Sequence, residues 1–145
     1  MAGDNRYHSI FGAVQGCVAV NPSDTAPALV ALNARILTTK RTIDVEKLWA
    51  VKVPGTTVLD PAEIITEIQV PQPPPGLKSA FVKFALRTSI DFPIVNCAAA
   101  IGGGQARVCL NAVHNLPYRA LRAEDAIKNK TINESNAESA AAAGV

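Results

Sequence analysis

The chain has 145 residues, of which 48% are hydrophobic and 18% are charged, and its formal net charge is +2. This length fits one ordinary domain or two very small ones, and the composition is that of a folded globular protein. The weak and scattered positive charge predicts neither a nucleic-acid partner nor an anionic membrane surface. No apolar stretch approaches the roughly 20 residues that a membrane span needs.

Three cysteines, Cys17, Cys97 and Cys109, are far apart and set in apolar runs. This placement predicts buried free thiols in a reducing compartment. Without a C-x-x-C pair and with only two histidines, we expect no metal or iron–sulfur site in the chain itself. The N-terminal residues lack the apolar stretch of a signal peptide, so the expected location is cytoplasmic.

The first expected helix follows an apolar run that breaks at Asn21-Pro22. Ser23 or Asp24 can cap this helix, and its first turn tolerates Pro27. Apolar residues at helical spacing then continue to about residue 33. Asp24 projects where the backbone turns, and it has two interpretations: a simple N-cap, or a functional carboxylate in a strand–loop–helix site.

Several short elements are predicted next. Residues 35–39 and 42–45 read as strands, and 46–49 as a helical turn with Trp49 packed inward. Residues 63–70 largely alternate apolar and polar side chains, which indicates an exposed antiparallel strand. Within it Glu63 and Glu67 would share a face, and such surface carboxylates are usually solvated.

Residues 71–76, with four prolines and a glycine, form the clearest boundary in the sequence. Prolines cannot join a sheet interior and favour a stiff, extended connector. We therefore predict two domains, residues 1–70 and 77–145, joined by a Pro-rich linker at 71–76. A proline-rich ligand for a partner domain is the alternative interpretation of this segment.

The second half predicts strands at 80–87, 94–101 and 106–113, with a hairpin turn at the glycines 102–104. A helix is expected within residues 117–127. Thr131 and Glu134 have the spacing of a capping box, so Thr131 is expected to cap a last helix.

No motif of a nucleophile, metal-hydrolase or phosphate-binding loop is present, and no catalytic residue is identified. His8 has no partnered nucleophile nearby, which favours a structural role. The functional prediction therefore rests on a resemblance to a known family.

Four stretches in this order carry a resemblance to a known family: residues 3–12, 17–33, 59–71 and 79–84. Together they resemble the FAD-binding subunit of the molybdenum hydroxylases, which include xanthine dehydrogenase and aerobic carbon monoxide dehydrogenase. The resemblance covers nearly the whole chain and only the C-terminal portion of such a subunit. It implies an α+β fold: the end of an α/β FAD-binding lobe, then a three-stranded antiparallel sheet packed with helices.

The resemblance also implies a cofactor, partners and site residues. FAD would relay electrons from iron–sulfur clusters to an acceptor, and the partners would be molybdopterin-binding and iron–sulfur subunits or domains. Asp24 matches the aspartate that helps hold the flavin, and Ile65 matches the aliphatic residue that borders the isoalloxazine. Lys83 matches the lysine near the flavin edge, where a cation would stabilise an anionic reduced flavin.

The glycine-rich loops that bind the FAD diphosphate in this family are expected before this chain's first residue. Backbone N–H donors hold diphosphate in such sites, so the isolated chain should bind FAD weakly or not at all and be inactive. The alternative function is a stand-alone binding or assembly module, which would favour a homo-oligomer. A small hydrolase has no supporting motif.

Overall fold

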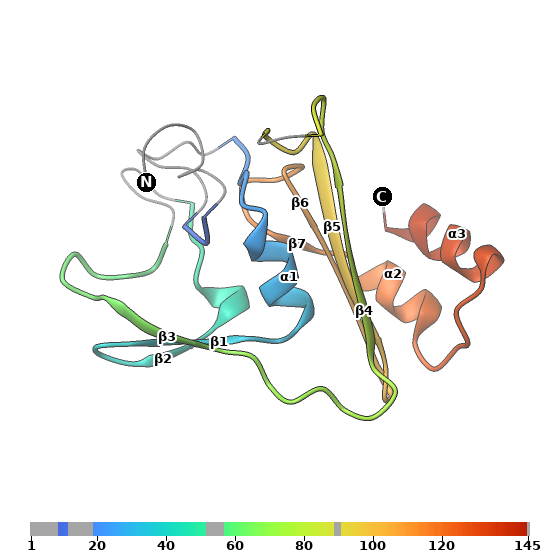
Figure 1. The fold of residues 1–145 in the computed structure, drawn as a ribbon, viewed down its shortest axis with the longest axis horizontal. Helices are drawn as coiled ribbons and strands as arrows, with labels where there is room; N and C mark the ends of the chain where they lie inside the picture. Colours follow the sequence, from blue (N-terminus) through green and yellow to red (C-terminus); the bar gives the residue numbers. More distant parts are fainter. Residues whose placement is uncertain (1–8, 12–18, 52–56, 89–90, 145) are drawn as a thin grey trace.

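The structure is a computed structural model that describes residues 9–11, 19–51, 57–88 and 91–144. Its elements form four layers, namely a small sheet, helix α1, a larger sheet, and a pair of helices on the far face (Figure 1). This arrangement confirms the α+β class. In chain order the elements are α1 (Thr25–Ala31), β1 (Arg35–Thr38), β2 (Thr42–Asp44), the 3-10 turn η2 (Val45–Lys47), β3 (Ile65–Gln69), β4 (Lys78–Phe84), β5 (Val95–Gly102), β6 (Gln105–Asn111), β7 (Tyr118–Arg119), α2 (Leu121–Ile127) and α3 (Glu134–Ala143).

Helix α1 lies between the two sheets and belongs to both of their cores. Ala26 and Val30 pack with the small sheet and η2, while Ala31 packs with Ala98 and Ala100 of β5. Two adjacent buried faces on one short helix require small side chains, which this alanine-rich segment supplies.

The end of α1 is fixed by backbone geometry. Asn33 has a positive φ of 56°, and its N–H donates to the Val30 carbonyl at 3.0 Å. The N–H of Ala34 reaches back to the Leu29 carbonyl, also at 3.0 Å. These two bonds form a Schellman motif, and asparagine tolerates the left-handed conformation that the motif needs. The helix therefore ends at Ala31, two residues before the predicted end near residue 33.

The small sheet is antiparallel, in the order β2-β1-β3. Its central residue Ile36 is fully buried, and it shares a core with Val45, Leu48 and Trp49. The inward packing predicted for Trp49 is confirmed, because its side chain is 5% exposed and its Nε1–H donates to the Ile10 carbonyl at 2.7 Å. Strand β3 is exposed along most of its length, as its alternation predicted.

The prediction that the Glu63 carboxylate is solvated is wrong. It lies just before β3 and is buried, and its two oxygens accept hydrogen bonds from Arg41 at 3.0 Å each. The Thr38 hydroxyl donates at 2.7 Å and the Asp60 N–H at 3.1 Å. Arg41, followed by Thr38, lowers the pKa of Glu63 to about 2. No local pattern predicts this contact, because Arg41 is 22 residues away from Glu63 in the chain.

The larger sheet is antiparallel, in the order β4-β5-β6-β7. The glycine turn between β5 and β6 is confirmed, since Gly103 and Gly104 both have positive φ, 58° and 79°. Two consecutive positive φ values define a hairpin turn that matches strand twist. The predicted three-stranded sheet is wrong by one short strand, because Tyr118 and Arg119 pair with β6 instead of starting the helix. Backbone pairing to Leu110 and Cys109 outweighed the helical periodicity read from the sequence.

Helices α2 and α3 cover one face of this sheet. Ala123 and Ile127 of α2 and Ala140 of α3 pack with the apolar side chains of β5 and β6. The prediction that Thr131 caps the last helix is wrong. Asn133 is the N-cap, and its side chain and that of Asn136 accept from each other's backbone N–H, both at 3.0 Å. An asparagine pair satisfies the same two orphan donors as the predicted threonine–glutamate pair.

Residues 70–77 connect β3 to β4 without regular structure apart from a turn at 75–76. The division into domains 1–70 and 77–145 stays a prediction.

Among the described residues, no helix is long and apolar enough to cross a membrane. Cys109 is buried and Cys97 is half-buried, and neither forms a disulfide in the described part of the chain. Cys17, Tyr7 and His8 lie outside the described residues.

Candidate functional site

The site begins with the loop that precedes α1. Ser23 is fully buried, and its hydroxyl oxygen accepts from the Ala26 N–H at 3.1 Å, so Ser23 supplies the side-chain cap of the helix. Asp24 occupies the N-cap position, yet its side chain makes no capping hydrogen bond. The interpretation of Asp24 as a simple N-cap is therefore wrong. Because Ser23 caps the helix end, the Asp24 carboxylate makes its hydrogen bonds to other parts of the chain.

Asp24 and Lys83, which are 59 residues apart, form an ion pair. Lys83 Nζ donates to Asp24 Oδ2 at 2.7 Å, and Asn96 Nδ2 donates to Asp24 Oδ1 at 3.0 Å. The Asp24 side chain is 28% exposed and the Lys83 side chain 22% exposed. A partly buried pair of this kind is screened less than a surface pair, and it keeps one side accessible to a ligand.

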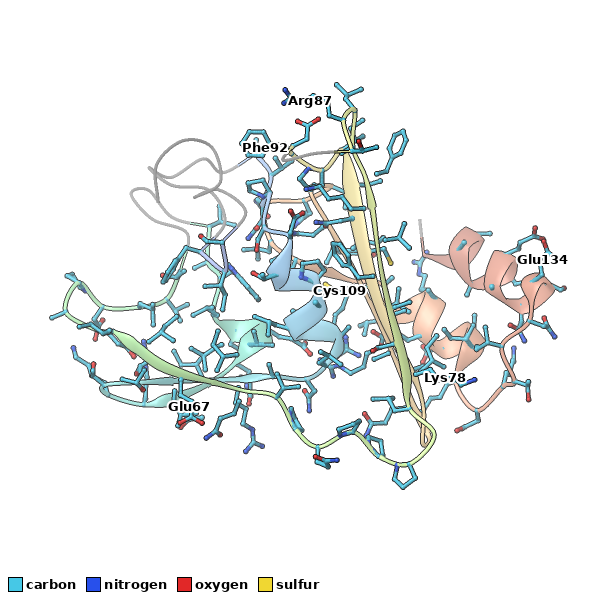
Figure 2. The ribbon with its side chains drawn as sticks, viewed as in Figure 1. Glu67, Lys78, Arg87, Phe92, Cys109 and Glu134 are labelled. Carbon is cyan, nitrogen blue, oxygen red and sulfur yellow. The ribbon has the colours of Figure 1, made fainter. Side chains whose placement is uncertain are left out.

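Lys83 is itself fixed by the turn that follows β4. Its Nζ also donates to the Asp91 carbonyl at 2.6 Å. The Asp91 carboxylate accepts from Arg87 and from the backbone N–H of Phe92, and these contacts, the Arg87 side chain first, lower its pKa to about 2. Figure 2 shows Arg87 and Phe92 together at this end of the larger sheet. The lysine head is therefore oriented by two acceptors from different parts of the chain.

Buried amide side chains lie beneath this pair. Asn96 and Asn111 are 1% and 0% exposed, and both donate to the Ser23 carbonyl, at 3.2 and 2.7 Å. Asn21 is also buried, and its Oδ1 accepts from the Ser23 N–H at 3.0 Å. None of these three asparagines was predicted as a site residue from the sequence. The available signal was the asparagine inside the apolar run 94–101, since a polar side chain buried in a strand needs a partner.

Ile65 lies apart from this pair. It is the first residue of β3 in the small sheet, where its partly buried side chain packs against the core around Ile36 and Trp49. Figure 2 shows β3, marked by Glu67, on a different side of the molecule from Arg87. The neighbouring Ile64 is 65% exposed and presents the aliphatic surface at this position. The structure thus brings together two of the three predicted site residues.

The chemistry of Asp24 and Lys83 fits part of a flavin nucleotide. A carboxylate can accept from the N–H and O–H groups of a flavin, and an ammonium can donate to its carbonyl and phosphate oxygens. The FAD diphosphate requires a different kind of site, formed by backbone N–H donors. In the described part of the chain, the glycines with positive φ lie at 76 and 102–104, in the connector and the hairpin. Neither position starts a helix, where a phosphate-binding loop would lie.

Comparison with known proteins assigns a family to the first half of the described chain. Residues 9–73 match the FAD-binding domain in molybdopterin dehydrogenase, and this part of the chain belongs to that domain family. The resemblance read from the sequence is thereby confirmed.

Curated relatives extend the match to most of the chain. The FAD-binding subunit PaoB of the aldehyde oxidoreductase of Escherichia coli (strain K12) is 34% identical over 137 residues, which is 87% of this chain and 42% of that subunit. The medium chain of the glyceraldehyde dehydrogenase of Sulfolobus acidocaldarius is 29% identical over 133 residues, 86% of this chain and 47% of that protein. The chain therefore spans less than half the length of these relatives.

Solved structures agree with this assignment. Quinoline 2-oxidoreductase from Pseudomonas putida 86 superposes with a TM-score of 0.72 and 26% identity, over 94% of this chain and 47% of that one. A carbon monoxide dehydrogenase from Hydrogenophaga pseudoflava that lacks the Mo-pyranopterin moiety superposes with a TM-score of 0.70 and 25% identity. The match covers 84% of this chain and 45% of that one. The chain shares the fold of the FAD-binding subunits of these enzymes.

Proposed function

We propose that this chain forms part of the FAD site of a molybdenum-hydroxylase flavoprotein subunit, with Asp24 and Lys83 beside the flavin and Ile65 bordering its ring. The observation that supports this proposal is the 2.7 Å pair between Lys83 and Asp24, two residues identified independently of the structure. FAD would supply the redox chemistry, relaying electrons from iron–sulfur clusters to an external acceptor. Molybdopterin-binding and iron–sulfur subunits or domains would be its partners.

In this proposal the protein's own contribution is position and charge. Lys83 reaches the site from β4, and Asp24 reaches it from the loop before α1, so the site depends on α1 packing against the larger sheet. The ammonium would favour negative charge on a reduced flavin, and the carboxylate would accept from a polar group of the cofactor. The unpaired thiols of Cys97 and Cys109 support a reducing compartment, and we propose the cytoplasm.

The decisive test is a chimera in which this chain replaces the matching part of the E. coli aldehyde oxidoreductase FAD-binding subunit. The purified chimera should carry FAD, as measured by its visible spectrum and flavin fluorescence. Asp24→Ala and Lys83→Met should each weaken FAD binding by about tenfold or more, since each removes a charge-assisted contact. The matched control is Asp44→Ala, which breaks an exposed 3.0 Å ion pair between the end of β2 and Lys47 of η2.

A folded chimera without FAD would overturn the proposal. If Asp24→Ala and Asp44→Ala bound FAD equally well, the assignment of the site would be wrong. The isolated chain should bind FAD weakly or not at all, because backbone donors for the diphosphate are expected elsewhere. A tightly bound yellow chromophore on the isolated chain would contradict this last expectation.

A second candidate function, a binding or assembly module, is favoured by one apolar surface. A groove of about 450 Å³ lies between β5 and β6 on one side and α2 and α3 on the other, with almost entirely apolar lining. Val82 and Phe84 of the edge strand β4 pair in register with Cys97 and Val95 of this lining, and they are 68% and 60% exposed. Apolar surface of this kind favours association with a second copy. A clean monomer by light scattering at high concentration would count against this function.

A further inference from the structure

One face of the larger sheet carries a row of three polar side chains. Lys83 of β4 lies opposite Asn96 of β5, and Asn96 lies opposite Asn111 of β6. Residues directly opposite one another in antiparallel strands point to the same face of the sheet. The next positions of β5 on this face are Ala98 and Ala100, which pack against α1. The polar row therefore borders the contact that Ala98 and Ala100 make with α1, at the start of the helix.

The middle member of this row, Asn96, uses its amide nitrogen on the loop before α1. Its Nδ2 donates to the Ser23 carbonyl at 3.2 Å and to Asp24 Oδ1 at 3.0 Å. The reverse orientation of the amide would place its oxygen against two acceptors, so the observed orientation is the one these partners require.

This arrangement has an energetic cost. Asn96 Oδ1 is buried and has no hydrogen-bond partner among the described residues. A buried oxygen without a donor is destabilising, whereas an apolar side chain of similar shape would avoid the cost. Stability alone does not explain an asparagine here. Its distinctive contact is with the Asp24 carboxylate.

We propose that Asn96 is a positioning residue that orients the Asp24 carboxylate for flavin binding. Asn96 holds Oδ1 and Lys83 holds Oδ2, so both oxygens of Asp24 are fixed from the sheet. Ser23 takes over the helix cap, which leaves the carboxylate turned toward the sheet and not toward the helix end. The inference rests on the proposed flavin role of Asp24 and adds a residue on which that role depends.

Asn111 provides a matched control for Asn96. It is equally buried, its Oδ1 also has no hydrogen-bond partner among the described residues, and its Nδ2 also donates to the Ser23 carbonyl. Its second contact is with Asn21 Oδ1 at 3.4 Å and not with Asp24. Asn96→Leu and Asn111→Leu therefore both remove a bond to the Ser23 carbonyl, and they differ in the second bond, which goes to the Asp24 carboxylate from Asn96 and to Asn21 from Asn111.

The first measurement needs no flavin. Urea unfolding of this chain gives a double-mutant cycle between Asn96→Leu and Asp24→Ala, and a second cycle with Asn111→Leu in place of Asn96→Leu. The Asn96 cycle should show a coupling of about tenfold in the unfolding equilibrium constant, as expected of a hydrogen bond to a charged group, and the Asn111 cycle less than about twofold. Equal coupling in both cycles would overturn the proposal. If the leucine variants do not fold, Asn96→Ser and Asn111→Ser replace them.

The second measurement uses the chimera that carries FAD. Asn96→Leu should weaken FAD binding by about tenfold, close to the effect of Asp24→Ala, and Asn111→Leu by less than about threefold. If Asp24→Ala weakens FAD binding and Asn96→Leu does not, Asn96 is structural only and the proposal is wrong. If Asp24→Ala itself has no effect, the proposed flavin site fails together with this role, while the unfolding cycle still decides whether Asn96 holds Asp24.

Discussion

Removal of the Glu124 carboxylate should be among the most destabilising single changes outside the apolar core. Glu124 lies in the first turn of α2, and its side chain is 7% exposed. Its Oε1 accepts from Arg119 Nε at 2.9 Å and from the Val108 N–H at 2.9 Å, and its Oε2 pairs with Arg119 Nη2. This pairing raises the pKa of Arg119. One carboxylate thus links α2 to β6 and β7.

The magnitude follows from burial. Removing one partner of a fully buried ion pair costs about 3–5 kcal/mol. Arg119 is 25% exposed and keeps its contacts with Glu46, so the cost of Glu124→Ala should lie at the lower end of this range. We expect about 3 kcal/mol, which includes the cost of leaving the Val108 N–H unpaired. Glu46 is 37% exposed although it pairs with both Arg107 and Arg119. Exposed pairs contribute little, so Glu46→Ala should cost about 1 kcal/mol or less.

Urea unfolding followed by circular dichroism at neutral pH measures both variants. With a slope of about 2 kcal/mol per molar urea, Glu124→Ala should lower the midpoint by about 1.5 M with an unchanged slope. High salt should reduce the cost of Glu46→Ala and leave that of Glu124→Ala nearly unchanged, because buried pairs are screened less. Equal costs for the two variants, or a cost below about 1 kcal/mol for Glu124→Ala, would refute this reasoning.

Three further predictions follow from burial and pKa. Ile36 is fully buried at the centre of the small sheet, so Ile36→Ala should cost about 3 kcal/mol and Ile36→Val about 1 kcal/mol by urea unfolding; similar costs for the two would contradict the packing. Arg41 holds the pKa of Glu63 near 2 in the folded state, against 4.5 otherwise. Glu63 therefore stabilises the fold above about pH 4.5, and its contribution is lost as the pH falls through about 2. Urea midpoints of the native protein and Glu63→Gln should differ at pH 6 and converge near pH 2, and a constant difference would disprove this origin. Burial raises the pKa of the Cys109 thiol to about 12, so a thiol reagent at pH 8 should modify it only upon unfolding. Mass spectrometry locates the label, and modification of Cys109 as fast as that of the half-buried Cys97 would argue against its burial.

The sequence by itself determined the local elements and the resemblance to the FAD-binding subunits. Signals that act over a few residues were sufficient for the start of α1 after Ser23 and Asp24, the glycine turn at Gly103 and Gly104, and the inward side chain of Trp49. Such features depend on backbone preferences and on the pattern of neighbouring side chains. The sequence failed where a distant partner outweighed the local pattern, as with the buried Glu63 and the strand at Tyr118.

Only the tertiary structure decided how the site is built. The pair of Asp24 and Lys83 and the amide of Asn96 come from segments 59 and 72 residues apart, and no local pattern encodes their distances. Their meeting depends on the in-register pairing of β4 with β5 and on the packing of α1 against that face. A strand shifted by one residue would turn Lys83 or Asn96 to the opposite face. The sequence therefore supplied the chemical groups, and the register of the sheet placed them together.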